Sequence, residues 1–92
     1  MKYVLLGTLS ADWATRQRER TKAAKAKLKK LGIKLESVYY TQGAYDFVDA
    51  VDAPSAEAML AFSVWYAKAG YGRIVTMPAF SESVLEAAAK KA

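Results

Sequence analysis

The sequence predicts one α+β domain whose elements follow the order β-α-β-β-α-β, with a further helix at the C-terminal end. Its 92 residues are the size of a single domain. Runs rich in Val, Leu, Ile and Tyr alternate with two stretches in which apolar residues recur every three or four positions, as in helices. Two of the strand-like runs are separated only by Gly43 and Ala44, and strands this close in sequence form an antiparallel hairpin.

The first third of the chain is predicted to form one strand and one long helix. Residues Tyr3–Thr8 are rich in Val and Leu, which is typical of a strand buried on both faces. A helix is expected from Trp13 to Leu31, because small and apolar residues recur at helical spacing, namely Ala14, Thr21, Ala24, Leu28 and Leu31. Thr8, Ser10 or Asp12 can cap its start, and Gly32 is the expected end.

The remaining elements are the hairpin, a second helix and a last strand. Ile33–Gln42 and Tyr45–Asp52 are the predicted strands of the hairpin. A helix is expected over Ser55–Ala69 after Pro54, a residue that suits the first turn. Tyr71–Phe80 is the last predicted strand, and Pro78 near its end indicates a position at the edge of the sheet. A short alanine-rich helix is expected to start at residues 81–83.

This order of elements is the ferredoxin-like split βαβ arrangement. Because crossover connections are right-handed, both internal helices are expected on one face of a four-stranded antiparallel sheet with the spatial order 4-1-3-2. The other face is left bare. A bare sheet face that carries Tyr, Phe, Leu and Val is an exposed apolar patch, and such patches mark interfaces or ligand sites.

The composition limits the classes of protein that need to be considered. Hydrophobic residues make up 53% of the chain, more than a small monomer easily buries, so we expect a homodimer or a higher homo-oligomer. Cysteine and histidine are both absent, which removes thiolates, disulfides and the commonest metal ligand. We therefore expect no metal site and no cofactor. No segment has the roughly 18 apolar residues of a membrane span, and no signal peptide is recognisable, so a soluble cytoplasmic protein is expected.

The positive charge is concentrated in the first predicted helix. The net charge is +5, and eight of the fourteen cations lie between Arg16 and Lys30, where Glu19 is the only acid. A clustered basic face is the electrostatic signature of nucleic-acid binding. The cations flank the apolar stripe on both sides, however, and no aromatic residue follows Trp13 within the cluster. We therefore favour a solvated helix face and do not expect nucleic acid as the main partner.

The hairpin carries a resemblance to a known family. Several segments of the chain together resemble the GYD-domain family. They are Leu35–Asp46, which ends in Gly43-Ala44-Tyr45-Asp46, and in addition Leu31-Gly32, Ala53-Pro54 and the closing residues 76–80. The resemblance implies a single domain over residues 1–92 and a dimeric α+β barrel, in which two ferredoxin-like sheets face each other and enclose a cavity. The hairpin is also similar to that of the ligand-binding domains of leucine-responsive regulators. A cavity of this kind implies a small-molecule ligand.

Tyr45 and Asp46 are the first candidate site residues. In one interpretation they stand at the mouth of the inter-sheet cavity and hold an amine or hydroxyl of a ligand. In the other, which we favour, Asp46 accepts backbone N–H bonds in the hairpin and Tyr45 packs at an interface, because aspartate suits such local bonds.

Asp49 is the candidate with the sharpest chemical consequence. Strand alternation places it on one face with Tyr45, Phe47 and Val51, and we expect this face to line the cavity. An unpaired buried carboxylate has a raised pKa and can serve as a general base. The alternative, which we favour, is an ion pair with Arg73 or a lysine, or a water-exposed position that results from a shift in strand register. Tyr39 is expected to supply a further polar contact to the ligand.

These observations lead to three hypotheses about function. The first is a homo-oligomeric protein that binds a small molecule in the inter-sheet cavity through Tyr39, Tyr45, Asp46, Asp49 and Arg73. The second is a cofactor-independent monooxygenase or isomerase-type enzyme in which Asp49 is the base. The third is a purely structural assembly, or a nucleic-acid-binding protein that uses the basic helix.

Overall fold

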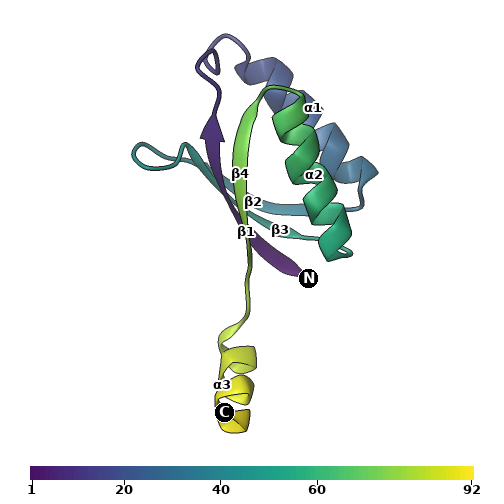
Figure 1. Ribbon diagram of the computed structural model, residues 1–92, viewed down its shortest axis with the longest axis vertical. Coiled ribbons are helices and arrows are strands. Elements are labelled where there is room, and N and C mark those ends of the chain that lie inside the picture. Colours follow the sequence, from purple (N-terminus) through teal and green to yellow (C-terminus); the bar gives the residue numbers. More distant parts are fainter.

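The computed structural model describes all residues, Met1 to Ala92, and has the predicted order of elements (Figure 1). Its strands and helices are, in chain order, β1 (Lys2–Leu9), α1 (Gln17–Lys30), β2 (Lys34–Tyr40), β3 (Phe47–Asp52), α2 (Ala56–Lys68), β4 (Gly72–Pro78) and α3 (Glu82–Lys91). None of the three helices is both long and apolar enough to cross a membrane.

The four strands form one antiparallel sheet in the order β2-β3-β1-β4. This order confirms the predicted topology, and β4, which ends at Pro78, is an edge strand as expected. Helices α1 and α2 lie on one side of the sheet (Figure 1), so the fold is ferredoxin-like. The opposite side carries no helix, and we call it the uncovered face.

Helix α1 begins four residues later than the sequence predicted, because residues 10–16 form successive turns. The turns are closed by backbone bonds from Trp13 to Ser10 and from Thr15 to Asp12, at 3.1 and 3.2 Å. The Ser10 hydroxyl donates to Asp12 at 2.6 Å, so these polar side chains are used within the turns and do not cap the helix. Arg16 occupies the N-cap position without a side-chain cap.

Strand β2 contains a bulge that breaks its simple alternation. Leu35 pairs with Val51 and Ser37 with Ala50, so the ladder shifts register between Leu35 and Ser37. A bulge adds one residue to a strand, and the residues beyond it therefore change face. Val38 accordingly lies on the same side as Leu35, which strict alternation did not predict.

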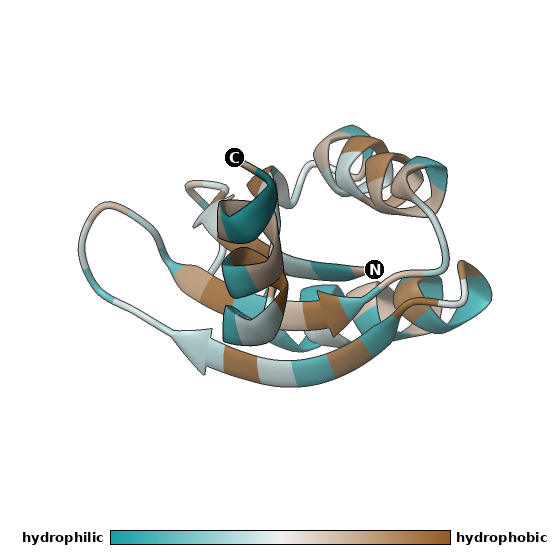
Figure 2. Cartoon of the chain, turned by 90° about the horizontal axis from the view of Figure 1, so that it is seen from below, coloured by the Kyte–Doolittle hydropathy of each residue, from teal (hydrophilic) through white to brown (hydrophobic).

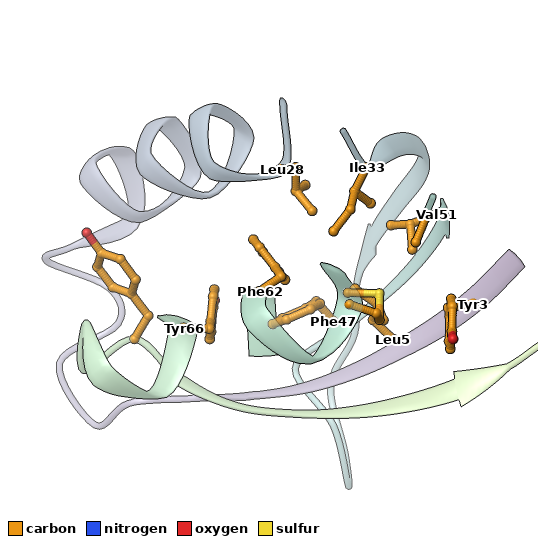
Figure 3. Close-up of a cluster of buried hydrophobic side chains, with 11 residues drawn as sticks. Tyr3, Leu5, Leu28, Ile33, Phe47, Val51, Phe62 and Tyr66 are labelled. Atoms are coloured by element: carbon orange, nitrogen blue, oxygen red, sulfur yellow. The ribbon is translucent and has the colours of Figure 1, made fainter. Parts of the chain in front are cut away.

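The hydrophobic core lies between the sheet and the two helices (Figure 3). Leu28 of α1 and Phe62 of α2 point toward strand residues that include Leu5 and Phe47. Aromatic pairs connect α2 to the sheet, and the ring centroids of Phe47 and Tyr66 are 6.0 Å apart. The eleven buried apolar residues are Tyr3, Leu5, Leu28, Ile33, Phe47, Val51, Ala53, Met59, Phe62, Tyr66 and Tyr71.

The uncovered face is apolar at its centre. Val4 pairs with Ala50 and Met77 on its two sides, and cross-strand partners share a face. The next apolar row consists of Leu6, Val48 and Val75. Figure 2 shows hydrophobic and hydrophilic residues alternating along the strands, which is the pattern of a sheet with two different faces.

Candidate functional site

A pocket of about 300 Å³ lies between α1 and the helix-covered side of β2 and β3. We call it the α1 pocket. Part of its wall is apolar and comes from Ala24, Leu28, Leu35, Val38, Phe47 and Phe62. The polar side chains in the wall are Gln17, Arg20, Thr21, Lys25, Tyr40, Asp49 and Tyr66. An apolar pocket with a few polar groups is the usual form of a small-molecule site.

Strand pairing places Asp49 in the wall of this pocket. Asp49 stands opposite Leu5 of β1 and Val38 of β2, and cross-strand partners point to the same side of the sheet. Leu5 is fully buried beneath the helices. Asp49 therefore faces α1, and the predicted orientation away from the helices was wrong.

The reason for this orientation is the size of the residues that alternate with Asp49. Phe47 and Val51 share its side of β3 and fill the core, with exposures of 5% and 0%. The smaller Val48 and Ala50 remain on the uncovered face. Burial of the larger apolar side chains stabilises the fold more, and it carries Asp49 to the helix side.

The environment of Asp49 favours its protonated form. Burial raises the pKa of the Asp49 carboxyl from 3.8 to about 6. Its Oδ1 atom is buried without a hydrogen-bond partner. Asp49 forms no ion pair with a lysine or with Arg73. Arg73 lies on the other side of the sheet, on the uncovered face opposite Thr8. A carboxylate with this pKa is ionised at neutral pH and is able to accept a proton or a hydrogen bond.

Arg20 is a second charged group of the α1 pocket, and only 3% of its surface is exposed. Its guanidinium donates to the Trp13 carbonyl oxygen at 3.5 Å and to the Gln17 side-chain oxygen. Gln17 in turn donates to the hydroxyls of Thr21 and Tyr40, at 3.4 and 3.3 Å. Arg20 is therefore held by neutral groups and forms no ion pair. A buried cation of this kind favours an anionic or electron-rich partner.

Two tyrosine hydroxyls complete the polar part of the wall. Burial acts to raise the pKa of the Tyr40 hydroxyl, but hydrogen bonding from Thr21, Gln17 and Arg20 outweighs it, so this pKa is lowered. Burial raises the pKa of Tyr66, although the charge of Arg20 acts in the opposite direction. Tyr66 therefore stays a neutral hydroxyl over the physiological pH range. No group of three or more side chains is placed to hold a metal ion.

The hairpin residues Tyr45 and Asp46 make mainly backbone interactions. The Asp46 carboxylate accepts a hydrogen bond from the Leu9 N–H at 2.7 Å, and the Asp46 N–H donates to the Gly7 carbonyl oxygen at 2.7 Å. The Tyr45 carbonyl accepts a bond from the Thr41 hydroxyl at 2.6 Å. The two bonds of Asp46 tie the loop to β1 beyond the last paired residues, whereas the bond between Thr41 and Tyr45 lies within the loop. The bonds of Asp46 support its structural interpretation, whereas the packing of Tyr45 at an interface stays a prediction.

Tyr39 and Arg73 lie on the other side of the sheet from the α1 pocket. Tyr39 stands opposite Val48 on the uncovered face and is 69% exposed. Arg73 is exposed on the same face. The fold thus separates these two predicted ligand-binding residues from Asp49, and a shared site for all three is excluded within one chain.

The comparisons with known proteins agree with this architecture. The family model of the GYD domain matches residues 3–89. The chain belongs to the GYD-domain family. No curated protein sequence matches this GYD domain.

Five chains of solved structures match this GYD domain, and one of them illustrates the shared fold. It is 5-chloro-2-hydroxyhydroquinone dehydrochlorinase (TftG) from Burkholderia phenoliruptrix, in complex with 2,5-dihydroxybenzoquinone. The TM-score is 0.64 at 16% sequence identity, and the alignment covers 90% of this chain and 97% of the other. At this identity the similarity shows a common fold.

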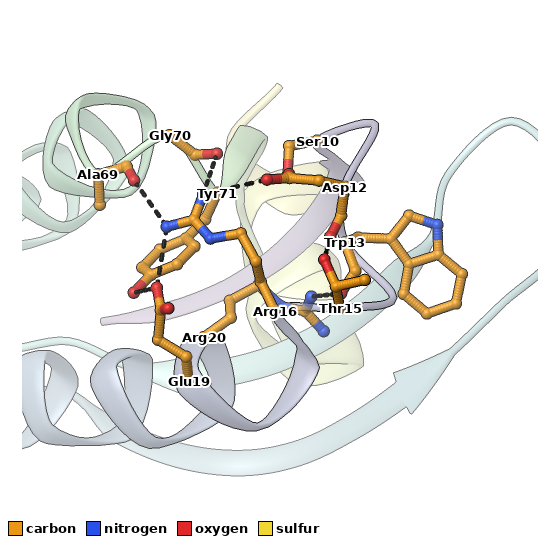
Figure 4. A network of polar contacts seen from close by, with 10 residues as sticks. All are labelled: Ser10, Asp12, Trp13, Thr15, Arg16, Glu19, Arg20, Ala69, Gly70 and Tyr71. Carbon is orange, nitrogen blue, oxygen red and sulfur yellow. Dashed lines mark hydrogen bonds and ion pairs between the residues drawn. The ribbon is translucent and has the colours of Figure 1, made fainter.

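A polar network holds α1 of the GYD domain to the end of α2 (Figure 4). Arg16 donates to the carbonyl oxygens of Gly70 and Ala69, at 3.2 and 3.4 Å. It also pairs with Glu19 at 2.9 Å and stacks over the Tyr71 ring at 4.6 Å from its centroid. The Tyr71 hydroxyl donates to the same Glu19 carboxylate at 2.8 Å. Two members of the basic segment, Arg16 and Arg20, therefore have structural contacts in the folded chain.

The sequence-based prediction missed Gln17, Arg20, Tyr40 and Tyr66 as pocket residues. A signal for two of them was present, because Gln17 and Arg20 continue the Thr21-Ala24-Leu28 stripe by one turn toward the N-terminus. Residues on one helical stripe face the same neighbour. Two polar residues on a stripe that otherwise faces the core would have indicated a polar pocket beneath α1.

Proposed function

We propose that this GYD domain binds a small, flat, hydroxyl-bearing molecule in the α1 pocket, with Asp49 as the acceptor of its hydrogen bond or proton. The observation that carries this proposal is the unpartnered Asp49 oxygen in the wall of a pocket that also contains a buried arginine. Structural polar groups are normally satisfied by the protein. A buried acceptor that lacks a donor is therefore suited to a donor from a ligand.

The size and lining of the pocket support a ring-shaped ligand. Its volume of about 300 Å³ lies at the lower end of ligand sites in proteins. Phe47, Phe62 and Leu28 offer apolar surface to the faces of a ring, while Arg20 and Asp49 offer opposite charges to its polar edge. The complex of TftG with 2,5-dihydroxybenzoquinone gives an example of such a ring bound to a protein of this fold.

The proposal places the ligand on the helix side of the sheet. The sequence-based hypothesis of a site in an inter-sheet cavity stays a prediction, since it depends on a second copy of the chain. That hypothesis assigns the ligand to Tyr39, Tyr45, Asp46, Asp49 and Arg73, of which Tyr39 and Arg73 lie on the uncovered face and Asp49 does not. The two hypotheses therefore make different predictions for substitutions at Tyr39 and Arg73.

A binding experiment with one probe tests the α1 pocket. We expect hydroquinone, a flat ring that keeps both of its hydroxyl protons at pH 7.5, to bind the wild-type protein, as measured by isothermal titration calorimetry. Asp49→Asn should weaken binding at least about tenfold, because a hydrogen bond to a charged group is lost. Asp52→Asn is the matched control, since Asp52 lies on the same strand but pairs with the N-terminus and Lys2 at the surface. Equal effects of the two substitutions, or no binding of the probe by the wild type, would reject the proposal.

A second candidate function is proton transfer from the bound ring. The pKa of about 6 at Asp49 supports it, because a general base acts best when its pKa is near the working pH. In an isomerase or a cofactor-independent monooxygenase, Asp49 would remove a proton from the bound molecule. The anion formed would be stabilised by the Arg20 guanidinium, which is buried in the same pocket.

Solvent exchange distinguishes binding alone from proton transfer. A base at Asp49 should accelerate the exchange of the ring hydrogens of 2,5-dihydroxybenzoquinone with D₂O, measured by proton NMR. A deuteron from solvent first adds to the electron-rich ring carbon, and Asp49 then removes the proton from that tetrahedral carbon, so the ring is restored and no other reactant is needed. We expect Asp49→Asn to lower the accelerated rate by about 10²-fold or more. A rate that equals the protein-free background in the wild type would leave binding as the function.

A further inference from the structure

The C-terminal helix is the one element that has no packing partner in its own chain. Helix α3 makes no contact with another helix or strand, and none of its residues is buried. It projects from the end of β4, away from the rest of the molecule (Figure 1). It has ten residues, whereas isolated helices shorter than ~12–15 residues are marginally stable in water. A helix of this length therefore needs a surface on which to pack.

One side of α3 is suited to such packing. Val84, Leu85 and Ala88 recur at helical spacing on this side, and Val84 and Leu85 are 49% and 66% exposed. Phe80, just before the helix, is 73% exposed. We call these four residues the apolar side of α3. Apolar surface of this kind marks an interaction site.

The uncovered face provides a matching apolar surface on another copy. Val75 and Met77 of β4 are exposed on this face. The Ala79 N–H donates to the Lys2 carbonyl oxygen at 2.9 Å, which extends the pairing of β4 to β1. Only two residues then separate the paired strand from α3, and the helix leaves its own sheet as an arm.

The charges on this side of the molecule favour a second copy of the chain as the partner. Glu82 and Glu86 of α3 and Arg73 of the uncovered face form no ion pairs within the chain. In a two-fold dimer the same surface meets itself, so the acids of each arm approach the arginine face of the other copy. The helix side of the sheet is different, because α1 carries seven cations and one acid and would repel a second copy.

We propose that α3 is an exchange arm that packs its apolar side against the uncovered face of a second copy in a two-fold dimer. This interaction is independent of ligand binding in the α1 pocket. It gives the uncovered face and the arm a common role, since each copy covers the apolar surface of the other. It also accounts for a high hydrophobic content of 53% in a chain with thirteen buried residues.

Removal or substitution of the arm tests this proposal. The variants are a chain that ends at Ala79 and the full chain with Leu85→Glu. Ser83→Glu is the matched control, because it adds the same charge to the opposite side of the same helix. Sedimentation velocity over a wide concentration range should show a dimer for the wild type and the control. The dissociation constant should rise at least about tenfold in the two test variants, because an apolar anchor of the interface is lost.

Unfolding measurements guard against an effect on folding. Since α3 makes no contact within the chain, the variant that ends at Ala79 should keep the circular dichroism of the folded sheet and its two remaining helices. Loss of the dimer in a folded variant supports the proposal. A wild type that stays monomeric at all concentrations, or a shortened variant that dimerises like the wild type, overturns it.

Hydrogen exchange tests whether the arm packs on a second copy of the chain. Peptides from residues 80–92 should be protected from exchange in concentrated wild-type protein and should lose this protection on dilution. Protection that persists in a monomer would mean that the arm folds onto its own chain, and this result rejects the exchange. An unprotected arm in a dimer would reject it as well.

Discussion

At the scale of single residues, the Phe47 ring occupies the space that a side chain at position 7 would need. The two residues stand opposite each other in the ladder, and a Cβ added to Gly7 would overlap the Phe47 ring. Phe47 lies across the backbone of Gly7 and also packs against Tyr66. A glycine is therefore required at this position for a close approach, and not for its backbone angles.

We expect Gly7→Ala to lower the free energy of unfolding by about 1–3 kcal/mol, which is the usual cost of overpacking a core. Urea unfolding monitored by circular dichroism measures this change. The double variant Gly7→Ala with Phe47→Leu should recover part of the loss, because the smaller side chain makes room for the added methyl group. Simple additivity of the two single effects would show that the ring does not cause the strain.

At the scale of elements, two serine caps of the same geometry should differ in their effect on stability. Ser55 accepts the Ala58 N–H at 3.1 Å and begins α2, which contributes Met59, Phe62 and Tyr66 to the core. Ser81 accepts the Val84 N–H at 3.4 Å and begins α3, which packs on nothing within the chain. A cap contributes to the unfolding free energy only if its helix is part of the cooperative fold.

We expect Ser55→Ala to lower the unfolding free energy by about 1 kcal/mol, the typical cost of a lost N-cap. Ser81→Ala should leave it unchanged when it is measured at a concentration at which the chain is monomeric. Thermal and urea unfolding of both variants provide the comparison. A loss of equal size at Ser81 would show that α3 is coupled to the core.

The boundaries of the elements show what local sequence determines. The edge position of β4 was predicted correctly, since Pro78 within the strand itself indicates it. The start of α1 was predicted too early, because Ser10 and Asp12 bond to each other and within the turns. The bulge after Leu35 was also missed. It depends on pairing with β3, which strict alternation along one strand does not reveal.

At the scale of the whole molecule, the order and handedness of connections predicted the fold, whereas the site depends on packing between distant elements. The alternation along β3 correctly grouped Phe47, Asp49 and Val51, but it did not determine which side the helices cover. Only the contact of the sheet with α1 brings Asp49 and Arg20 into one pocket. No spacing in the sequence predicts that contact, because the two residues lie on different elements far apart along the chain.

The stability of the whole domain should depend on pH in a way that reveals the buried carboxyl. Hydrogen bonding to Arg16 and Tyr71 lowers the pKa of Glu19, and bonds from the N-terminus and Lys2 lower that of Asp52. A lowered pKa means that the folded state holds the proton less tightly than the unfolded state. The stability from these two groups is present above their ordinary pKa values and is lost as the pH falls.

Asp49 acts in the opposite direction, because its pKa is raised from 3.8 to about 6 in the folded state. The folded chain then binds the proton more tightly, so the unfolding free energy decreases as the pH rises from 3.8 to about 6 and stays lower above that range. After allowance for partial solvent screening, the loss amounts to about 1–2 kcal/mol.

The wild type should therefore be most stable at about pH 5, as measured by urea unfolding at a series of pH values. Asp49→Asn should remove the decline above that pH, raising the unfolding free energy at pH 8 by about 1–2 kcal/mol while leaving that at pH 4 nearly unchanged. Asp52→Asn should instead lower stability at pH 8, because an ionised and paired carboxylate is lost. If Asp49→Asn changed stability equally at pH 4 and pH 8, the carboxyl would not titrate in the buried position that the α1 pocket assigns to it.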